Sequence, residues 1–319
     1  MIITKKLNLA VSGHKDINFI DIDDYADTRL YIDPYVIIAS SDYFCEKAKL
    51  AINSFFVELF IACKTGDKHR IKELVSHASE PNETNLGMRS SSKTGKGTTD
   101  EELKKLLLEF YEVVRRNPEL KINPMAISIY IKNFAEDKMS DLITNIIRKS
   151  LYEFTYAECQ RWGIPLNPAV EKLGYFWDYE TLQWKELYGQ SLKVEDRKIL
   201  LVPKTIVRKQ YIFNVEGFIQ KYILSVLQDE QLEKKSDMCH YKNLKDGTQK
   251  IYPPTKRELS KKYIEGTPHK DFALSFSTAY KESNDWYYNE VINQICRGVG
   301  ELSDAQLDGF VYNKYKDIS

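Results

Sequence analysis

The sequence predicts an α+β protein in which helices pack around a small mixed β-sheet. Apolar residues recur at helical spacing over residues 47–65 and again over 140–162, where they form a wide stripe. Residues 175–184 and 190–202 have the pattern of a β-hairpin or meander that ends in a buried strand. A nuclease-like core is compatible with this combination of helices and strands.

Shorter elements are expected in the N-terminal part. Residues 2–12 alternate as a first strand does, and a second apolar run ends at Asp33, where a proline follows. Residues 67–77 predict a short helix, and residues 100–117 predict a longer one with acids in its first turn. The polar residues 79–100 form a long loop between them, and loops of this length are typical of functional segments.

The C-terminal part is less regular. Residues 124–135 fit either a strand or a helix. The amphipathic pattern of residues 214–231 predicts a helix. The chain after it is expected to be rich in loops up to a terminal helix near residues 286–296.

Charge is unevenly distributed, although the formal net charge is zero. Residues 14–46 hold eight acids against two bases, whereas residues 197–262 hold fifteen bases against seven acids. We expect one interleaved domain over residues 1–319, with an acidic, helical half at 1–120 and a basic α/β half at 121–319. Such asymmetry predicts either a polyanion partner on the basic half or two halves that face each other.

Cysteine usage and hydropathy indicate a cytoplasmic protein. The five cysteines are widely spaced and form no CxxC pair, so neither a disulfide framework nor a zinc knuckle is indicated. The N-terminus lacks the long apolar region of a signal peptide. The longest apolar stretch, residues 55–63, is far shorter than the roughly 20 residues of a membrane span. We therefore expect no membrane association.

The long polar loop suggests a contact with phosphates. Gly95-Lys96-Gly97-Thr98 offers free backbone N–H groups, a lysine and a hydroxyl, and Lys93 lies just before it. A Walker A loop needs GxxxxGK followed directly by Ser or Thr, and this spacing fails here. An NTPase is therefore not indicated, and a loop that closes on phosphates through Lys93 and Lys96 is the alternative.

Four acids are candidate magnesium ligands. Glu80 and Glu83 precede the loop, Asp33 ends a predicted strand and Asp141 begins a predicted helix. Magnesium prefers carboxylate oxygens beside a phosphate, so these acids would form a metal site if they met. Asp141 has a structural alternative, because an acid at a helix N-terminus caps the helix and suits its dipole.

Lys204 is the candidate catalytic lysine, because it ends an apolar strand. Restriction-type nucleases place an acid and a lysine on one strand as (D/E)xK, but Val202 occupies the acid position before Lys204. Asp196 and Lys198 have the correct spacing, although they are expected in the turn that leads into the strand. The predicted catalytic residues are Asp141, Glu83 and Lys204.

The basic C-terminal third is the predicted nucleic-acid surface. Its lysines are interleaved with five tyrosines, and cations beside aromatic rings are suited to binding phosphates and stacking on bases. The tyrosines are Tyr211, Tyr222, Tyr241, Tyr252 and Tyr263. The predicted contacts, beside Lys93 and Lys96 in the loop, are Arg148, Arg208, Lys256, Arg257, Lys261 and Lys262.

Several stretches resemble a family of uncharacterised bacterial proteins found in variable genome regions. They are residues 31–34, 80–87, 140–148 and 201–204, and the resemblance extends over most of residues 15–275. Proteins distributed in this way are often components of phage-defence or restriction-like systems. The resemblance therefore implies a nucleic-acid target and carries no named activity.

Two functions remain open from the sequence. The first is a metal-dependent, nucleic-acid-cleaving effector of a bacterial antiphage system with magnesium as its cofactor. The second is a non-catalytic sensor or scaffold subunit that binds nucleic acid or a partner protein, or that forms a homo-oligomer. The position of the four acids discriminates between them, because a single metal site requires that they meet.

Overall fold

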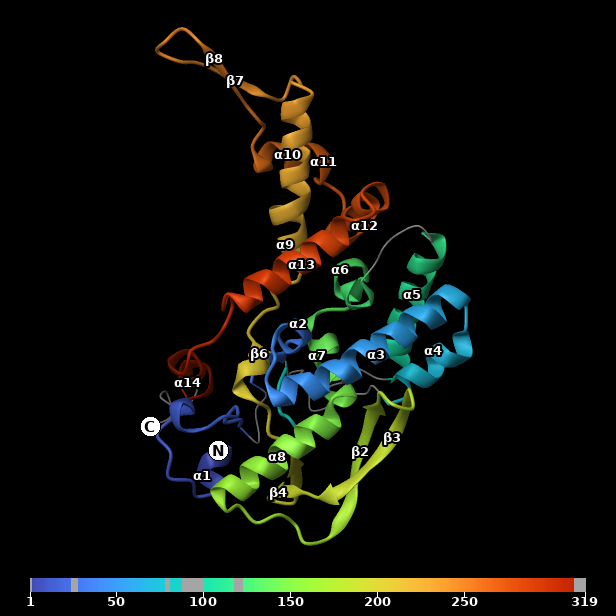
Figure 1. Ribbon diagram of the computed structural model, residues 1–319, viewed down its shortest axis with the longest axis vertical. Helices are drawn as coiled ribbons and strands as arrows, with labels where there is room; N and C mark the ends of the chain where they lie inside the picture. The colour runs from blue at the N-terminus through green and yellow to red at the C-terminus, as the bar shows by residue number, and fades with distance from the viewer. Residues whose placement is uncertain (1, 24–27, 78–80, 88–99, 118–122, 313–319) are drawn as a thin grey trace. The chain divides into compact units, whose positions relative to one another are not determined.

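The computed structural model of the protein describes residues 2–23, 28–77, 81–87, 100–117 and 123–312 (Figure 1). Helices dominate these residues, and the strands among them form four two-stranded antiparallel sheets. The predicted α+β class is therefore confirmed, with separate small sheets in place of one mixed sheet. No helix among these residues is long and apolar enough to cross a membrane.

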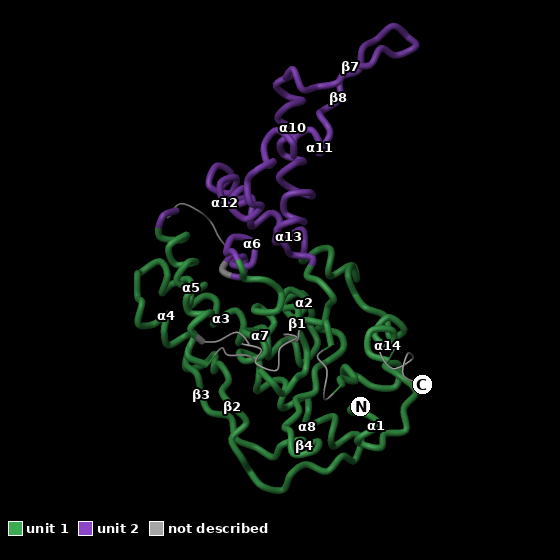
Figure 2. Tube along the Cα trace, turned by 180° about the vertical axis from the view of Figure 1, so that it is seen from behind, with its two compact units in different colours: residues 1–115, 133–211, 292–319 green, residues 116–132, 212–291 purple. Residues whose placement is uncertain are grey.

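The chain divides into two compact units, which Figure 2 distinguishes by colour. Unit 1 comprises residues 1–115, 133–211 and 292–319, and unit 2 comprises residues 116–132 and 212–291. Each unit is built from segments that are far apart in the sequence.

Unit 1 is built around the 23-residue helix α3, which contacts helices α2, α4, α7 and α8. Asp42 caps its first turn by accepting the N–H of Cys45, and Gly66 ends it in the left-handed conformation with φ +78°. Phe55 and Phe56 are buried on the inner face of α3. The helices of this unit are α1 Ile3–Lys6, α2 Pro34–Ala39, α3 Tyr43–Thr65, α4 Lys68–Val75, α5 Asp100–Arg116, α7 Glu136–Ile146, α8 Arg148–Trp162 and α14 Asp304–Tyr312, with short 3₁₀ turns η1 His14–Asp16 and η3 Lys204–Ile206.

The prediction of one helix over residues 140–162 was wrong in one respect, because two helices occupy this region. The chain leaves helical geometry at Ile147, with φ −93° and ψ 13°, and α8 resumes at Arg148. Ile146 and Ile147 are both buried. The apolar residues on both sides of the break in the helix stay buried. The apolar period of the sequence therefore continues through the break and does not reveal it.

The strands of unit 1 pair as short hairpins or bridges. β2 Val170–Asp178 pairs with β3 Gln183–Gln190, and β4 Leu192–Val194 pairs with β5 Arg197–Ile199, so strands occupy parts of both predicted regions. The buried strand predicted up to residue 202, with Lys204 at its end, was wrong, because β5 ends at Ile199 and Lys204 begins a 3₁₀ turn. Residues 200–202 are buried, which explains their apolar pattern. β1 Tyr31–Ile32 pairs with β6 Val207–Arg208.

The strand predicted at residues 2–12 was wrong, because the segment begins with helix α1. The N–H of Thr4 donates to Asp21 Oδ1 at 2.9 Å and its hydroxyl donates to Asp21 Oδ2 at 2.6 Å. The N–H of Ile3 donates to the carbonyl of Ile22 at 3.0 Å. Ile2 also forms an isolated antiparallel bridge with Asp23, so the backbone of this segment is paired with residues 21–23 through single contacts and not through a continuous strand.

Unit 2 has its own aromatic core. Phe213 stacks on Tyr287 with ring centroids 5.1 Å apart, and Phe218 lies at the same distance from Tyr287. The predicted helix at 214–231 is confirmed, although part of it is a π-helix. The elements of this region are η2 Pro124–Ala126, α6 Ile127–Tyr130, α9 Val215–Gly217, η4 Phe218–Ile223, α10 Leu224–Glu233, β7 His240–Asn243, β8 Gln249–Tyr252, α11 Lys256–Tyr263, α12 His269–Ala279 and α13 Ser283–Cys296.

Candidate nucleic-acid interface

Residues 240–263 of unit 2, here called the basic arm, contain a hairpin followed by a helix. The hairpin is β7–β8 and the helix is α11. Seven bases stand against two acids over these 24 residues, so the formal net charge of the arm is +5. The prediction that this part of the chain is rich in loops was wrong. The bases are Lys242, Lys245, Lys250, Lys256, Arg257, Lys261 and Lys262.

The hairpin turn is fixed by its own residues. The N–H of Leu244 donates to the carbonyl of Thr248 at 2.7 Å, and the side chain of Asp246 accepts from the N–H and hydroxyl of Thr248 at 3.0 and 2.6 Å. Gly247 adopts φ +81°, which suits glycine because other residues rarely enter this region. An Asp-Gly pair between alternating residues is a known hairpin signal, and sequence reasoning missed it here.

Helix α11 begins after Pro253 and Pro254 with a capping box. The hydroxyl of Thr255 accepts the N–H of Glu258, and Glu258 Oε2 accepts the N–H of Thr255 at 2.8 Å. His240 Nε2 lies 2.9 Å from the same carboxylate oxygen and connects the hairpin to the helix. The hydrogen bond with His240 has the largest effect on the carboxyl group of Glu258, followed by those with Thr255, and together they lower its pKa to about 2.

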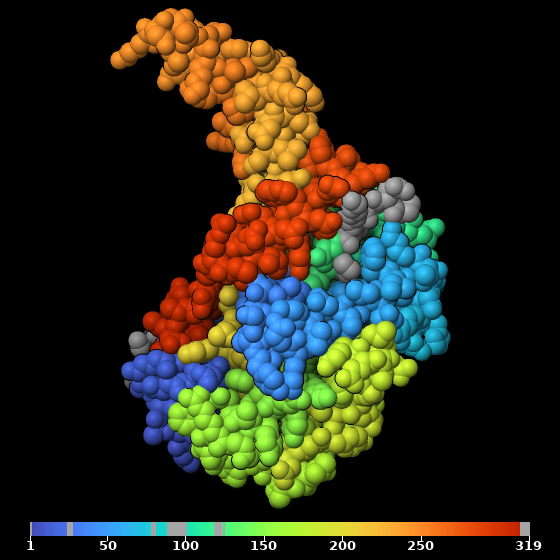
Figure 3. All heavy atoms as spheres, in the orientation of Figure 1, coloured from blue at the N-terminus to red at the C-terminus, as the bar shows by residue number. Residues whose placement is uncertain are grey.

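The arm exposes its positive charge. Every residue of β7 and β8 is exposed except Ile251, which is half-buried, and Figure 3 draws the hairpin in orange. Among the described residues, no ion pair joins any of the seven bases to an acid. Lys256 donates to the carbonyl of Gln220 at 2.5 Å, and Lys262 lies 3.3 Å from the sulfur of Met238. Unpaired lysines and arginines of this kind attract phosphates, because binding releases the counterions of the nucleic acid.

Three of the five predicted tyrosines lie among these bases, whereas Tyr211 is buried in unit 1. Tyr241 is 54% exposed, and Tyr252 and Tyr263 are each 37% exposed. Lys250 lies over the ring of Tyr252 at 5.1 Å, and Lys262 lies over the ring of Tyr263 at 5.5 Å. Exposed aromatic rings beside cations are suited to stacking on nucleic-acid bases.

Only part of the predicted nucleic-acid surface lies in the arm. Lys256, Arg257, Lys261 and Lys262 belong to α11, whereas Lys93 and Lys96 lie outside the described residues. The hairpin lysines Lys242, Lys245 and Lys250 were not predicted.

The two predicted arginines are buried in unit 1. Arg208 is 4% exposed and donates from Nη1 to the carbonyls of Thr205 and Val207. Arg148 is 5% exposed. The prediction that these arginines contact nucleic acid was therefore wrong, because neither guanidinium reaches the surface.

Asp33, a predicted magnesium ligand, is fully buried at the start of α2. Its Oδ1 accepts the N–H of Tyr35 at 2.9 Å, and its Oδ2 has no hydrogen-bond partner within the part of the chain that the structure describes. Burial raises the pKa of Asp33 to about 7, against the lowering effects of the Tyr35 N–H and of the Arg208 charge. A carboxyl group that resists ionisation and faces no solvent is a poor ligand for a hard cation.

Glu83 and Arg148 form an ion pair. Arg148 Nη1 lies 2.9 Å from Glu83 Oε1 and 3.1 Å from the carbonyl of Leu173, and Nη2 donates to Asn145 Oδ1 at 2.7 Å. Sequence reasoning placed Glu83 and Arg148 in different roles, and the fold brings them together as partners.

Asp141 and Glu80 complete the predicted metal set. Asp141 does not begin a helix, because α7 starts at Glu136, and its carbonyl accepts from Asn145 Nδ2 at 3.1 Å. Glu80 lies outside the described residues. Within the described part of the chain, no group of three or more His, Cys, Asp or Glu side chains could hold a metal ion. The described acids therefore do not fit the predicted magnesium site.

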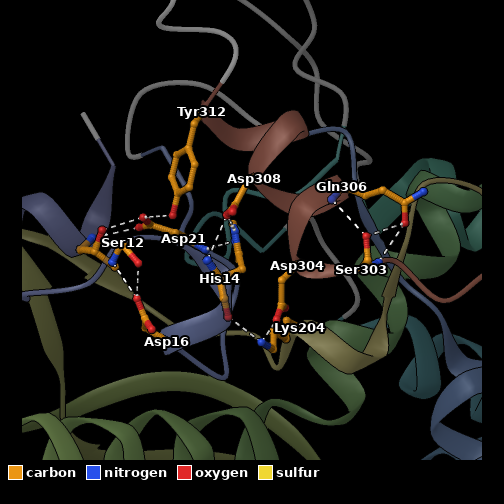
Figure 4. Close-up of polar contacts among 11 residues, drawn as sticks. Ser12, His14, Asp16, Asp21, Lys204, Ser303, Asp304, Gln306, Asp308 and Tyr312 are labelled. Carbon is orange, nitrogen blue, oxygen red and sulfur yellow. Dashed lines mark hydrogen bonds and ion pairs between the residues drawn. The ribbon is translucent and has the colours of Figure 1, made fainter.

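Lys204, the predicted catalytic lysine, is held by the C-terminal helix. Its Nζ lies 2.6 Å from Asp304 Oδ1 and 2.5 Å from the carbonyl of His14. Figure 4 shows Asp304 and Asp308 of α14 pointing toward Lys204 and His14. These contacts give Lys204 a structural role, and no described acid of the predicted catalytic set is among its bonded partners.

The model of one protein family, described as a domain of unknown function (DUF8370), matches residues 8–214. The chain belongs to this family. The DUF8370 region includes the stretches on which the resemblance to an uncharacterised family rests, and it ends close to residue 212, where the long segment of unit 2 begins. The basic arm lies outside it. No curated protein and no solved structure matches the chain.

Proposed function

We propose that this protein is a non-catalytic nucleic-acid-binding subunit whose contact surface is the basic arm. The observation that carries the proposal is the charge of the arm. Seven bases over 24 residues have no acid partner among the described residues, and three exposed tyrosines lie between them. The phosphates of a nucleic acid would neutralise the lysines and arginines of the arm, and its bases would stack on the tyrosine rings.

The alternative, a magnesium-dependent nuclease, lacks a ligand set in the described residues. Asp33 is buried, Glu83 is paired with Arg148, and no group of three potential ligands exists among these residues. We therefore derive no catalytic step through magnesium. The resemblance to proteins of variable genome regions supports a place in a bacterial antiphage system, in which such a subunit acts with a partner protein or as a homo-oligomer.

Salt-dependent binding tests this proposal. Fluorescence anisotropy of the full chain with labelled duplex DNA, single-stranded DNA and RNA is expected to show affinity that falls steeply as potassium chloride rises. Neutralising the bases of α11 should weaken binding and reduce the slope of log K against log salt by roughly 0.9 for each lost phosphate contact. The variant is K256Q/R257Q/K261Q/K262Q.

A matched control changes four exposed lysines in unit 1, the same number of bases as in the arm variant. The variant K5Q/K15Q/K68Q/K72Q removes four positive charges outside the arm and should keep the slope of the unaltered protein. Equal losses in the two variants would contradict a role specific to the arm. Incubation of plasmid with the protein and magnesium or manganese completes the experiment, because metal-dependent cleavage would favour the nuclease instead.

A further inference from the structure

The two faces of the β7–β8 hairpin differ in chemistry. Residues directly opposite each other in an antiparallel pair share a face, and neighbours along a strand alternate between faces. Tyr241 is opposite Ile251 and Asn243 is opposite Gln249, so these four residues form one face, here called the amide face. The other face, here called the lysine face, has two opposed pairs, which are His240 with Tyr252 and Lys242 with Lys250.

The lysine face contains a repulsive contact. Lys242 and Lys250 are directly opposite each other, and like charges at such positions destabilise a hairpin. Both lysines are exposed and neither forms an ion pair with a described acid. Anions that contact the two lysines would therefore stabilise the hairpin.

The amide face presents hydrogen-bonding groups without charge. Gln249 Nε2 donates to Asn243 Oδ1 at 3.2 Å, so the two amides lie side by side, and both residues are exposed. Each amide retains further donors and acceptors. Asparagine and glutamine are the side chains that bind N6 and N7 of adenine with two hydrogen bonds in the major groove.

The hairpin is free to enter a groove. Among the described residues, each of its strands pairs with the other and with no third strand, and no residue of either strand is buried. A two-stranded ribbon fits the major groove of B-form DNA, which is about 12 Å wide. The major groove of A-form RNA is too deep and narrow for side chains to read. Strands of four residues span about 13 Å, or about four base pairs.

From these observations we infer that the target of the arm is B-form DNA and that the hairpin enters its major groove. The amide face lies toward the base edges, and Lys242 and Lys250 reach the phosphates of the two groove walls. The inference rests on the proposed function and deepens it, because it names duplex DNA and predicts a preference for sites that contain adenine.

Selection from a random duplex library by the full chain, followed by anisotropy, tests the inference. A short motif of about four base pairs that contains adenine should be enriched. Two matched variants place threonine, a good strand former, on one face each, so the hairpin is retained in both. N243T/Q249T should lower affinity for the selected duplex about ten- to one-hundred-fold, to the level of a scrambled duplex, with an unchanged salt slope. K242T/K250T should weaken binding to every duplex and lower the slope by about 2.

The outcomes separate the two proposals. If no motif is enriched, or if N243T/Q249T keeps the affinity and preference of the unaltered protein while K242T/K250T binds more weakly, the hairpin contacts phosphates only. The groove inference then fails and the proposed function stands. Tighter binding to single strands or to duplex RNA would also overturn the inference. If the unaltered protein binds no nucleic acid at low salt, both proposals fail.

Discussion

The ring of His14 is hydrogen-bonded to the carboxylate of Asp308, with Nδ1 and Oδ1 2.7 Å apart across 294 residues of sequence. His14 Nε2 accepts the N–H of Asp21 at 3.1 Å, so the proton of the neutral ring lies on Nδ1. Asp308 Oδ1 also accepts the N–H of His14 at 3.0 Å. Gly13 leaves room for this carboxylate, because a Cβ atom there would lie 2.7 Å from Asp308 Oδ2. Helix α14 is thereby attached to the N-terminal segment (Figure 4).

Asp308→Ala should lower the free energy of unfolding by about 1–3 kcal/mol, because it leaves the buried ring and the N–H of His14 without an acceptor. The measurement is urea denaturation followed by fluorescence. Asp304→Ala on the same helix is the control. Asp304 contacts Lys204, whose side chain is 19% exposed, whereas the ring of His14 is fully buried, so the loss of Asp304 should cost less than about 1 kcal/mol. A larger cost for Asp304→Ala than for Asp308→Ala would contradict this account.

These α14 contacts also show where sequence reasoning stops. The 3.6-residue period identified α3, and the strand pattern of residues 175–184 and 190–202 located part of the β2–β3 and β4–β5 pairs, because those signals are local. The partner of Lys204 lies 100 residues away and that of His14 lies 294 residues away. Nothing in the local pattern specifies such pairs. The sequence therefore suggested a catalytic role for Lys204, whereas the structure shows its ammonium group bonded to Asp304.

The candidate site was predicted in the same uneven way. The charge of α11 could be read from composition, and Lys256 and Arg257 do lie in the basic arm. Asp33 could not be interpreted correctly, because a proline after an acid fits both the end of a strand and the start of a helix. The structure shows that both apply, since β1 ends at Ile32 and α2 begins at Pro34. Burial then excludes the carboxyl group from solvent.

The stability of the protein should fall as pH rises toward neutrality because of Asp33. Its pKa is about 7 in the folded protein against an ordinary value of 3.8, so the folded state keeps a proton that the unfolded state releases between these values. The stabilisation is complete below pH 4 and is lost as pH rises through about 7, by about 4 kcal/mol at most. Denaturation at pH 5, 6, 7 and 8 measures this slope.

Asp33→Asn should flatten that pH dependence, because asparagine stays neutral and remains a good N-cap for α2. The control is Asp16→Asn, which changes an exposed acid whose pKa is lowered by the N–H and hydroxyl of Ser12. It should leave the slope between pH 5 and 8 as it is. An Asp33→Asn protein with the full slope would show that another group is responsible.

Glu83 and Arg148 should be energetically coupled. The side chain of Arg148 is 6% exposed, so Glu83→Ala leaves a nearly buried charge without its carboxylate and should lower the free energy of unfolding by about 2 kcal/mol or more. A double-mutant cycle with Arg148→Met should give a coupling energy of about 1–3 kcal/mol. The control cycle uses Glu112 and Arg115, an exposed pair on α5, and should show little coupling. Equal coupling in the two cycles would argue against a structural role for the buried pair.

Gly174 should tolerate substitution much less well than Gly163. Gly174 lies at a register shift of β2 with φ +109°, and a Cβ atom there would lie 3.1 Å from Cδ, Cζ and Nε of Arg148. Alanine at Gly174 thus combines backbone strain with displacement of a guanidinium that is fixed by Glu83, and should cost about 2–4 kcal/mol.

Gly163 separates these two effects. It ends α8 with φ +65°, and apart from the adjoining backbone no heavy atom of the described residues lies within 4 Å of the position of an added Cβ. Gly163→Ala therefore carries the backbone cost alone, about 1 kcal/mol. The difference between the two variants in urea denaturation measures the contact with Arg148, and it should shrink when both are made in an Arg148→Met background. An unchanged difference in that background would mean that strain at Gly174, and not the guanidinium, sets its sensitivity.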